Sequence, residues 1–294
     1  MTTVGIIGLG AMGSAMAGAL VTAGHRPIGY DLQAAAVARF ASEGGQTARD
    51  AAEVAATADL IVLVLRDEGQ IDALLDMKDR AVVAFRPGAV VWVASTVSPA
   101  YVSRLGNRLA LAEVRVLDGP VSGGVARARA GKLTLILAGD EIAYSVASEF
   151  APALAERVFR VGNTPGAASV IKAANQLLTA SHIALTAEAL GFAIRAGVDP
   201  RTFLEVINVS AGASRMFADR APRMLDADLT PHATIGIFLK DLSIALDTAR
   251  LHGARIPMAA AAREVFREAA DAFGGDLGDP AIFGLYPREA EEQF

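Results

Sequence analysis

The residues from Gly8 to Gly13 have the spacing GxGxxG and stand between a short apolar run and a series of small residues. A strand, a tight glycine turn and a helix in this order form a cradle for the pyrophosphate of a dinucleotide, which the N–H groups of the helix start bind. Gly8 would allow the turn, Gly10 would admit the phosphates, and Gly13 would let the helix pack on the strand. The alternative is a glycine-rich turn in an apolar hairpin. The residues expected at the cofactor are Gly8, Leu9, Gly10, Ala11, Met12 and Gly13.

Asp31 directly follows the next apolar run, Ile28–Tyr30. A carboxylate at this place can accept hydrogen bonds from the adenosine ribose hydroxyls, and it repels a 2′-phosphate. Arg26 precedes the run and Gln33 is neutral, so no obvious cation awaits a phosphate. We therefore expect NAD to be favoured over NADP, with an ordinary turn aspartate as the alternative.

Lys172 lies in a long segment rich in Ala, Ile and Val, with Asn175 and Gln176 on the same face of a predicted helix. Partial burial would lower the pKa of its ammonium group and make proton exchange easier near neutral pH. The residues alone leave a second interpretation open, a lysine that extends from a buried helix to solvent.

Two segments after predicted strands offer groups that can bind small molecules. Ser122, Gly123 and Gly124 provide a hydroxyl and unobstructed backbone N–H groups, which suit a carboxylate, with a plain loop as the alternative. Thr96 lies at the carboxyl edge of the predicted sheet, where such folds bind ligands.

Composition excludes several classes of site. The 294 residues carry 27 basic and 32 acidic side chains without an evident basic tract, so nucleic acid is an unexpected partner. There is no cysteine and there are four scattered histidines, so we expect no metal site. Glycines interrupt the uncharged run from Thr2 to Gly24, and no basic region precedes it, so we expect a cytoplasmic protein without a membrane span.

The first half of the chain alternates short apolar runs with Ala-rich segments of helix length, which predicts a doubly wound parallel sheet of the Rossmann type. The runs expected as strands are Thr3–Ile7, Leu60–Leu65, Val90–Ala94 and Val114–Leu117, with Gln33–Ser42 and Ile71–Lys78 among the helices. Leu133–Leu137 and Arg157–Arg160 bracket a helix after Asp140 and are expected to extend the sheet edge.

The second half is predicted to be helical. Residues 167 to about 196 form one segment that is apolar nearly all round, so we expect a long interdomain helix (about 164–196) buried between domains or subunits, and a homodimer or homotetramer. The predicted domains are a dinucleotide-binding domain, 1–163, and an all-α domain, 164–294. The further helices expected are Asp199–Val209, Met216–Leu225, Phe238–His252 and Met258–Ala272.

The segment Ile6–Ala17 closely resembles the N-terminal signature of the β-hydroxyacid dehydrogenase family. Asp118–Gly124 looks like the family's substrate loop, Gly166–Asn175 its catalytic helix, and Phe238–Leu242 its C-terminal cofactor contact. The resemblance spans essentially the whole chain. It implies an NAD(P)-dependent oxidoreductase that acts on the hydroxyl of a small hydroxy acid, with the active site between a Rossmann domain and a helical domain.

The resemblance also implies roles for individual residues. Lys172 would be the general acid/base, and Thr96 would lie by the nicotinamide. Lys240 would contact the cofactor, although beside Asp241 it is, as a bare sequence feature, an ordinary surface pair. The residues implied at the substrate are Ser122, Gly123, Gly124, Asn175 and Gln176. Leu65, Arg66 and Gln70 are expected at the cofactor, at a place where many relatives have Leu-Pro and an Asn four residues after the Pro. The alternatives for Arg66 are contact with a substrate charge and a solvated side chain.

Departures from the family pattern leave the substrate open. Ala211–Phe217 and Asp228–His232 resemble the L-threonate branch, whereas Asn175–Gln176 mixes two branches and Gly119 stands where relatives usually have Ala. The alternatives are a 3-hydroxyisobutyrate dehydrogenase, a tartronate or succinic semialdehyde reductase, an imine or aldehyde reductase using NADPH, and a non-catalytic nucleotide-binding protein. His182 is expected to be a hydrogen-bonded core residue and His232 a loop residue.

Overall fold

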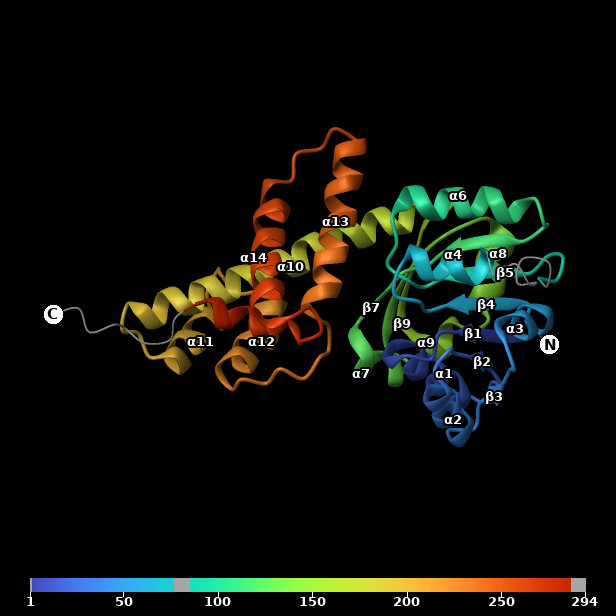
Figure 1. The fold of residues 1–294 in the computed structure, drawn as a ribbon, viewed down its shortest axis with the longest axis horizontal. Coiled ribbons are helices and arrows are strands. Elements are labelled where there is room, and N and C mark those ends of the chain that lie inside the picture. Colours follow the sequence, from blue (N-terminus) through green and yellow to red (C-terminus); the bar gives the residue numbers. More distant parts are fainter. Residues whose placement is uncertain (1, 77–84, 287–294) are drawn as a thin grey trace. The chain divides into compact units, whose positions relative to one another are not determined.

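The computed structural model describes residues 2–76 and 85–286. The chain folds as two compact units, Met1–Lys172 and Ala173–Phe294, called unit 1 and unit 2 below (Figure 1). The predicted helix Ile71–Lys78 begins earlier, at Glu68, and its last two residues lie outside the described ones.

Unit 1 contains a nine-stranded sheet with the order β3-β2-β1-β4-β5-β6-β8-β7, and β9 pairs with β8. The first six strands are parallel, which confirms the doubly wound Rossmann arrangement. The strands are β1 Val4–Ile7, β2 Ile28–Tyr30, β3 Gln46–Thr47, β4 Leu60–Leu63, β5 Val90–Val93, β6 Arg115–Asp118, β7 Val121–Ser122, β8 Leu133–Ala138 and β9 Ala155–Gly162.

Helices cover both faces of this sheet. Ile6 packs in a core with α1, and its neighbour Ile7 packs in a second core with α3, α4 and α6, because successive strand side chains point to opposite faces. Burial on both faces explains the continuous Val, Ile and Leu runs of β1, β4 and β5. The helices are α1 Ala11–Thr22, α2 Ala34–Ser42, α3 Ala51–Thr57, α4 Glu68–Asp76, α6 Pro99–Ala110, α7 Gly124–Arg129, α8 Glu141–Ser148 and α9 Ala151–Leu154.

The far edge of the sheet is antiparallel in part. β8 runs antiparallel to β6 and β7, whereas β8 and β9 are parallel. The predicted edge strands Leu133–Leu137 and Arg157–Arg160 correspond to β8 and β9. The strand β7 was not predicted, since a strand of two residues shows no periodicity in the sequence.

The helix α10, Ala167–Arg195, runs from unit 1 into unit 2. By length and composition it could cross a membrane, but half of its most apolar window is buried, as in a core helix. The remaining elements of unit 2 are α11 Pro200–Asn208, α12 Arg215–Leu225, α13 Ile235–Leu251, α14 Pro257–Phe273 and the 3-10 helix η1 Asp279–Leu285.

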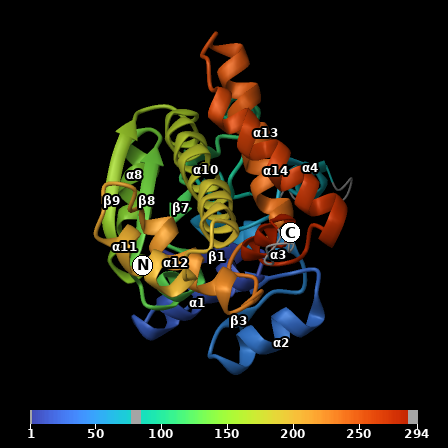
Figure 2. The same ribbon diagram turned by 90° about the vertical axis from the view of Figure 1, so that its left-hand side faces the viewer.

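Unit 2 has a core of its own, in which the rings of Phe238 and Phe266 lie 5.2 Å apart. These residues come from α13 and α14, which lie side by side (Figure 2). The helix α13 starts three residues before the predicted Phe238 because the Thr234 side chain accepts a hydrogen bond from the N–H of Ile237 and caps it.

Candidate active site

The glycine-rich turn lies at the switch point of the sheet, where β1 has β2 on one side and β4 on the other. Gly8 follows β1 with a φ of +98°, which glycine adopts readily. A Cβ at Gly13 would lie 1.8 Å from the carbonyl oxygen of Gly8, whereas a Cβ at Gly10 would meet no atom within 4 Å. The backbone is therefore open at Gly10, where a pyrophosphate can approach the N–H groups of the α1 start.

The peptide groups of Leu9 are held on both sides. The Leu9 N–H donates to Asp31 Oδ2 at 2.7 Å, and the Leu9 carbonyl accepts from Ser14 Oγ at 2.6 Å and Arg39 Nη2 at 3.1 Å. Asp31 Oδ1 accepts from the N–H of Gln33 at 2.8 Å. These contacts shape the turn before any ligand binds.

The loop after β4 contains the predicted cofactor residues Leu65, Arg66 and Gln70. The N–H of Leu65 donates to Ser95 Oγ at 2.8 Å, and the N–H of Arg66 donates to Gln70 Oε1 at 2.9 Å. Gln70 thus folds the loop back on itself and leaves the Arg66 side chain exposed. Thr96 follows Ser95 after β5 and is half-buried.

Ser122 ends β7, and Gly123 and Gly124 lead into the short α7. Their φ values are +139° and +75°, so a side chain at either position would be strained. Ser122 is half-buried and both glycines are exposed, so a hydroxyl and two backbone N–H groups stand together near the accessible surface.

The departure at Gly119 has a steric cause. Trp92, from β5, is fully buried, and its Nε1 donates to the Gly119 carbonyl at 2.7 Å. A Cβ at Gly119 would lie 2.0 Å from that same Nε1. The indole therefore fills the space that the methyl group of the family's usual Ala would need.

Lys172 lies on α10 and is 8% exposed. The helix begins beside Asp118, whose carboxylate accepts hydrogen bonds from Gly166 and Ser169 at the start of α10. Burial raises the pKa of Asp118, and these hydrogen bonds act in the opposite direction.

Within unit 2 a chain of polar contacts runs from Asn175 to Lys240. Asn175 Nδ2 donates to Gln176 Oε1 at 3.0 Å, and Gln176 Nε2 donates to the buried Asp241 Oδ2 at 2.6 Å. Lys240 Nζ donates to Asp241 Oδ1 at 2.6 Å. Gln176 therefore uses both ends of its amide inside unit 2, and it orients Asn175.

Comparisons with known proteins agree with this geometry. Residues 3–162 match the model described as the NAD binding domain of 6-phosphogluconate dehydrogenase, and residues 166–286 match the model described as NAD-binding of NADP-dependent 3-hydroxyisobutyrate dehydrogenase. L-threonate dehydrogenase of Cupriavidus necator is 40% identical over 97% of this chain and 96% of its own length. The chain belongs to the β-hydroxyacid dehydrogenase family.

Further relatives extend the match. L-threonate dehydrogenase of Escherichia coli is 34% identical, covering 96% of this chain and 94% of the relative. A crystal structure of 3-hydroxyisobutyrate dehydrogenase from Salmonella typhimurium has a TM-score of 0.90 and 34% identity, covering 97% of this chain and 100% of that chain. This β-hydroxyacid dehydrogenase is thus an NAD-dependent oxidoreductase that acts on CH–OH donors.

NAD fits the residues that this β-hydroxyacid dehydrogenase provides. The open backbone at Gly10 leaves room for phosphates, and the α1 start supplies N–H groups. Asp31 provides a half-buried carboxylate on the neighbouring strand end. The imine reductase from a Pseudomonas species shares the fold alone, at 22% identity and a TM-score of 0.67.

Sequence reasoning missed several residues of this site in the β-hydroxyacid dehydrogenase. Ser14 and Ser95 stand inside segments that the motifs had marked, so their positions gave a weak indication. Arg39 binds the Leu9 carbonyl 30 residues away, and Asp118 binds the segment that starts α10, 48 to 51 residues away. No local sequence pattern indicates contacts between residues so far apart.

Arg223 was also missed, although it organises the loop from Asp228 to His232. Its Nε donates to Asp228 Oδ2 at 2.9 Å, another guanidinium nitrogen donates to the Thr230 carbonyl, and Nη1 lies 3.3 Å from His232 Nδ1. Hydrogen bonds from Thr230 and Arg223 hold the pKa of Asp228 well below its usual range. His182 is half-buried on α10, and its carbonyl accepts from Thr186 Oγ1.

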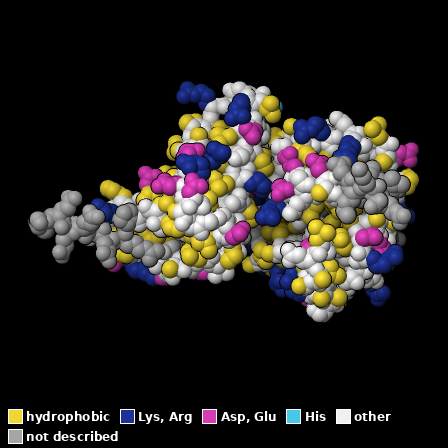
Figure 3. All heavy atoms as spheres, viewed as in Figure 1, with side chains coloured by type: hydrophobic (Ala, Val, Ile, Leu, Met, Phe, Trp, Pro, Cys, Tyr) yellow, Lys and Arg dark blue, Asp and Glu magenta, His cyan; other side chains and the backbone are white. Residues whose placement is uncertain are grey.

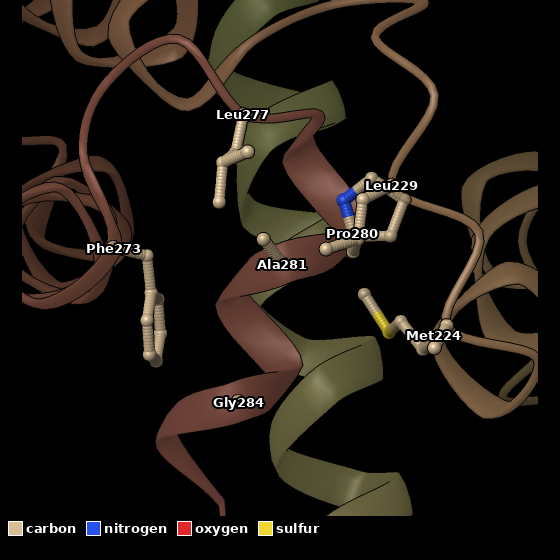
Figure 4. A pocket seen from close by; sticks show the side chains of 8 residues that line it. Met224, Leu229, Phe273, Leu277, Pro280, Ala281 and Gly284 are labelled. Atoms are coloured by element: carbon tan, nitrogen blue, oxygen red, sulfur yellow. The ribbon is translucent and has the colours of Figure 1, made fainter.

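A cavity of about 160 Å³ in unit 2 has a different character (Figure 4). None of the side chains that line it is charged or polar, so it offers no group for proton transfer. They are Met224, Ala227, Leu229, Phe273, Leu277, Pro280, Ala281 and Gly284.

On the face shown in Figure 3, acidic and basic side chains are intermixed.

Proposed function

We propose that the protein oxidises a hydroxyl of a small 3-hydroxy or polyhydroxy carboxylic acid, with an L-threonate-like acid as substrate, and that Lys172 is the general acid/base. The observation that carries this proposal is the burial of Lys172 on α10, one helical turn before Asn175. A lysine that merely extended its ammonium group into solvent would be far more exposed than 8%.

The proposed proton transfer uses the two protonation states of Lys172. NAD, when bound, supplies the acceptor for the hydride that leaves the alcohol carbon. In oxidation, neutral Lys172 takes the hydroxyl proton at Nζ; in reduction, the ammonium form returns it. A buried helix position limits the side chain to few rotamers, which favours a fixed direction of proton transfer.

The proposed substrate contacts divide between carboxylate and hydroxyl groups. The hydroxyl of Ser122 and the N–H groups of Gly123 and Gly124 would bind the carboxylate. Asn175, oriented by Gln176, would bind a hydroxyl group with its amide. These residues would align the acid with Lys172.

An L-threonate-like acid is favoured by the names of the relatives that are 40% and 34% identical. It is also favoured by the segments Ala211–Phe217 and Asp228–His232, which resemble that branch. 3-Hydroxyisobutyrate dehydrogenase and tartronate or succinic semialdehyde reductase activities are the alternatives. An NAD-reduction screen across three- to six-carbon hydroxy acids distinguishes them, with the highest kcat/KM expected for L-threonate.

The role of Lys172 is tested by Lys172→Ala. We expect kcat to fall by about 100- to 10,000-fold, as for the loss of a general acid/base, while the Kd for NADH stays within about twofold. Lys132→Ala is the matched control because Lys132 is an exposed lysine of unit 1. Turnover that survives in folded Lys172→Ala contradicts the proposed mechanism.

NAD is proposed to be preferred over NADP because of Asp31. Its carboxylate lies next to the glycine turn, bound to the N–H of Leu9, and a 2′-phosphate would meet its negative charge. Comparing the KM values for NAD and NADP tests this preference. A clear preference for NADP would overturn it.

Self-association is proposed through α10. Ile171, Leu178, Leu185 and Phe192 recur every seven residues, which places them along one face of the helix, and all four are exposed, Phe192 at 75%. A second copy of this chain presents the same stripe, so a homodimer, or a homotetramer built from it, would bury the stripe. The cytoplasmic location expected from the sequence stays a prediction.

Light scattering of the wild type and of Leu185→Glu tests this association. We expect a dimer or tetramer for the wild type and a smaller species for the variant, because a carboxylate would be buried in the interface. Leu111→Glu is the control, since Leu111 is an exposed leucine of unit 1. A monomeric wild type would rule the interface out.

A further inference from the structure

Asp118 joins the end of β6 to the start of α10. Its side chain is fully buried. Oδ2 accepts hydrogen bonds from the N–H groups of Gly166 and Ser169, both at 2.9 Å, and Oδ1 accepts from Ser169 Oγ at 2.6 Å. Both oxygens are thus bound to one turn of chain that lies 48 to 51 residues further along the sequence.

The start of α10 needs an acceptor from elsewhere. The first N–H groups of a helix have no partner within it, and a Ser, Thr, Asp or Asn at the preceding position usually accepts from them. Gly166 stands there with a φ of +120°, and a Cβ would lie 2.7 Å from Ser103 Oγ. Since a capping side chain does not fit at this position, the distant Asp118 provides the cap.

The position of Lys172 depends on the same turn. Ser169 and Lys172 are three residues apart on α10, so they lie on one face of the helix, about one turn apart. A hydrogen-bonded Ser169 therefore fixes the turn that carries Lys172. Lys172 itself lies within unit 1, the same compact unit as Asp118.

Asp118 also determines where the Ser122 loop begins. Only Gly119 and Pro120 separate it from β7, which contains Ser122, and the N–H of Gly119 donates to the Val93 carbonyl at 3.0 Å. One buried carboxylate thus adjoins both segments of unit 1 to which the proposed function assigns substrate contact and proton transfer.

We propose that Asp118 is a positioning residue, which sets the place of Lys172 relative to the Ser122–Gly124 loop by holding the first turn of α10. The inference rests on the proposed role of Lys172. Asp118 takes no proton from substrate in this scheme, because its oxygens are occupied by Gly166 and Ser169. Its effect on the reaction passes through Lys172.

The first experiment separates turnover from cofactor binding. In Asp118→Asn one oxygen becomes an NH₂ group, which cannot accept, and we expect kcat to fall by about 10- to 100-fold, the range expected when a catalytic group is displaced by roughly 1 Å. Ser169→Ala removes the hydroxyl bond and keeps both N–H bonds, so we expect a loss of about two- to fivefold. The Kd for NADH should stay within about twofold in both variants.

Asp140→Asn is the matched control for a simple loss of helix capping. Asp140 caps α8 in the same unit, where Oδ1 accepts from the N–H of Ala143 at 2.8 Å. We expect this variant to lower the melting temperature without changing kcat at a temperature where it is folded. Full kcat in folded Asp118→Asn, or a parallel weakening of NADH binding, would overturn the inference; if Asp118→Asn does not fold, unchanged kcat in Ser169→Ala would do so.

A double-mutant cycle with Lys172→Ala tests whether Asp118 acts through Lys172. In the Lys172→Ala background, Asp118→Asn should leave the residual single-turnover rate unchanged within about twofold, because the group it positions is gone. An equal loss in both backgrounds means a general structural role and overturns the inference. High activity in Lys172→Ala alone would instead contradict the proposed function, so the two failures are distinguishable.

Discussion

The helices α1 and α10 both begin at the carboxyl end of the sheet in unit 1, yet their starts are built differently. The start of α1 follows its strand at once, and its shape depends on Gly8 and Gly13. The start of α10 follows β9 after four residues, but the side chain that holds it, the buried Asp118, belongs to β6 and lies 48 residues before Gly166 in the sequence. The glycines that shape the start of α1 thus lie within its own turn, whereas the start of α10 is held by a side chain from a strand that is distant in the sequence.

The largest expected effect breaks the first of these starts. In Gly13→Ala the new methyl carbon would lie 1.8 Å from the Gly8 carbonyl oxygen, so the turn must open. We expect the affinity for NADH to fall by about 100-fold or more, or about 3 kcal/mol, measured by fluorescence titration.

Gly10→Ala is the matched comparison within the same turn. No atom lies within 4 Å of a Cβ at Gly10, so the free energy of unfolding should change by less than about 0.5 kcal/mol. We still expect weaker NADH binding, because the methyl group occupies the space proposed for the phosphates. Normal NADH binding by Gly13→Ala would show that the turn tolerates a side chain.

A second experiment disturbs the segment next to Asp118. Gly119→Ala would place a methyl group 2.0 Å from Trp92 Nε1 in a filled core, and we expect a loss of about 1–3 kcal/mol in the free energy of unfolding by urea denaturation. Adding Trp92→Phe to Gly119→Ala should recover part of that loss, since the smaller ring leaves room.

Gly18→Ala is the control for the substitution itself. Gly18 lies within α1, where the nearest atom to a Cβ is Glu43 Oε2 at 3.8 Å. We expect this variant to gain about 0.5–1 kcal/mol, because alanine favours the helix. If the losses in the free energy of unfolding caused by Gly119→Ala and Trp92→Phe were strictly additive, a clash with the indole would not explain why alanine is disfavoured at position 119.

Elements with a local sequence pattern were predictable, whereas contacts between distant segments were not. The strands β1, β2, β4, β5 and β6, the edge strands β8 and β9 and the long α10 followed from apolar runs and glycine spacing. The two-residue strands β3 and β7 and the helix α7 did not, because two residues or a Ser-Gly-Gly segment look the same in a loop. The Asp118 and Arg39 contacts depend on segments 30 or more residues apart, and a single sequence does not show which distant residues meet.

The smallest expected effect concerns the loop from Asp228 to His232. Unlike the start of α10, this loop is held by residues that are close in the sequence, Arg223 and Thr230. The pKa of Asp228 is lowered by Thr230 and Arg223, so the ionised form stabilises the fold. This contribution is present above the ordinary carboxyl pKa, near about 4, and is lost as the pH falls below it. We expect the melting temperatures of wild type and Asp228→Asn to differ more at pH 7 than at pH 3.

Asp276→Asn is the control for this pH dependence. Asp276 is an exposed carboxylate of unit 2, outside the Arg223 loop. We expect the melting temperature of Asp276→Asn to differ from that of the wild type by the same small amount at pH 7 and at pH 3. A difference in melting temperature for Asp228→Asn that does not narrow at low pH would mean that the ionised form of Asp228 does not stabilise the fold.

The Trp92–Gly119 pair further implies that changes at these two positions depend on each other. A tryptophan that arose opposite an alanine at position 119 would meet its methyl group inside a closed core, so the intermediate would be disfavoured. A glycine that arose first would leave only a small space, which a later indole could fill while gaining a hydrogen bond to the Gly119 carbonyl. With the indole in place, a change from Gly to Ala at position 119 thus carries a steric cost, so the residues at positions 92 and 119 constrain each other.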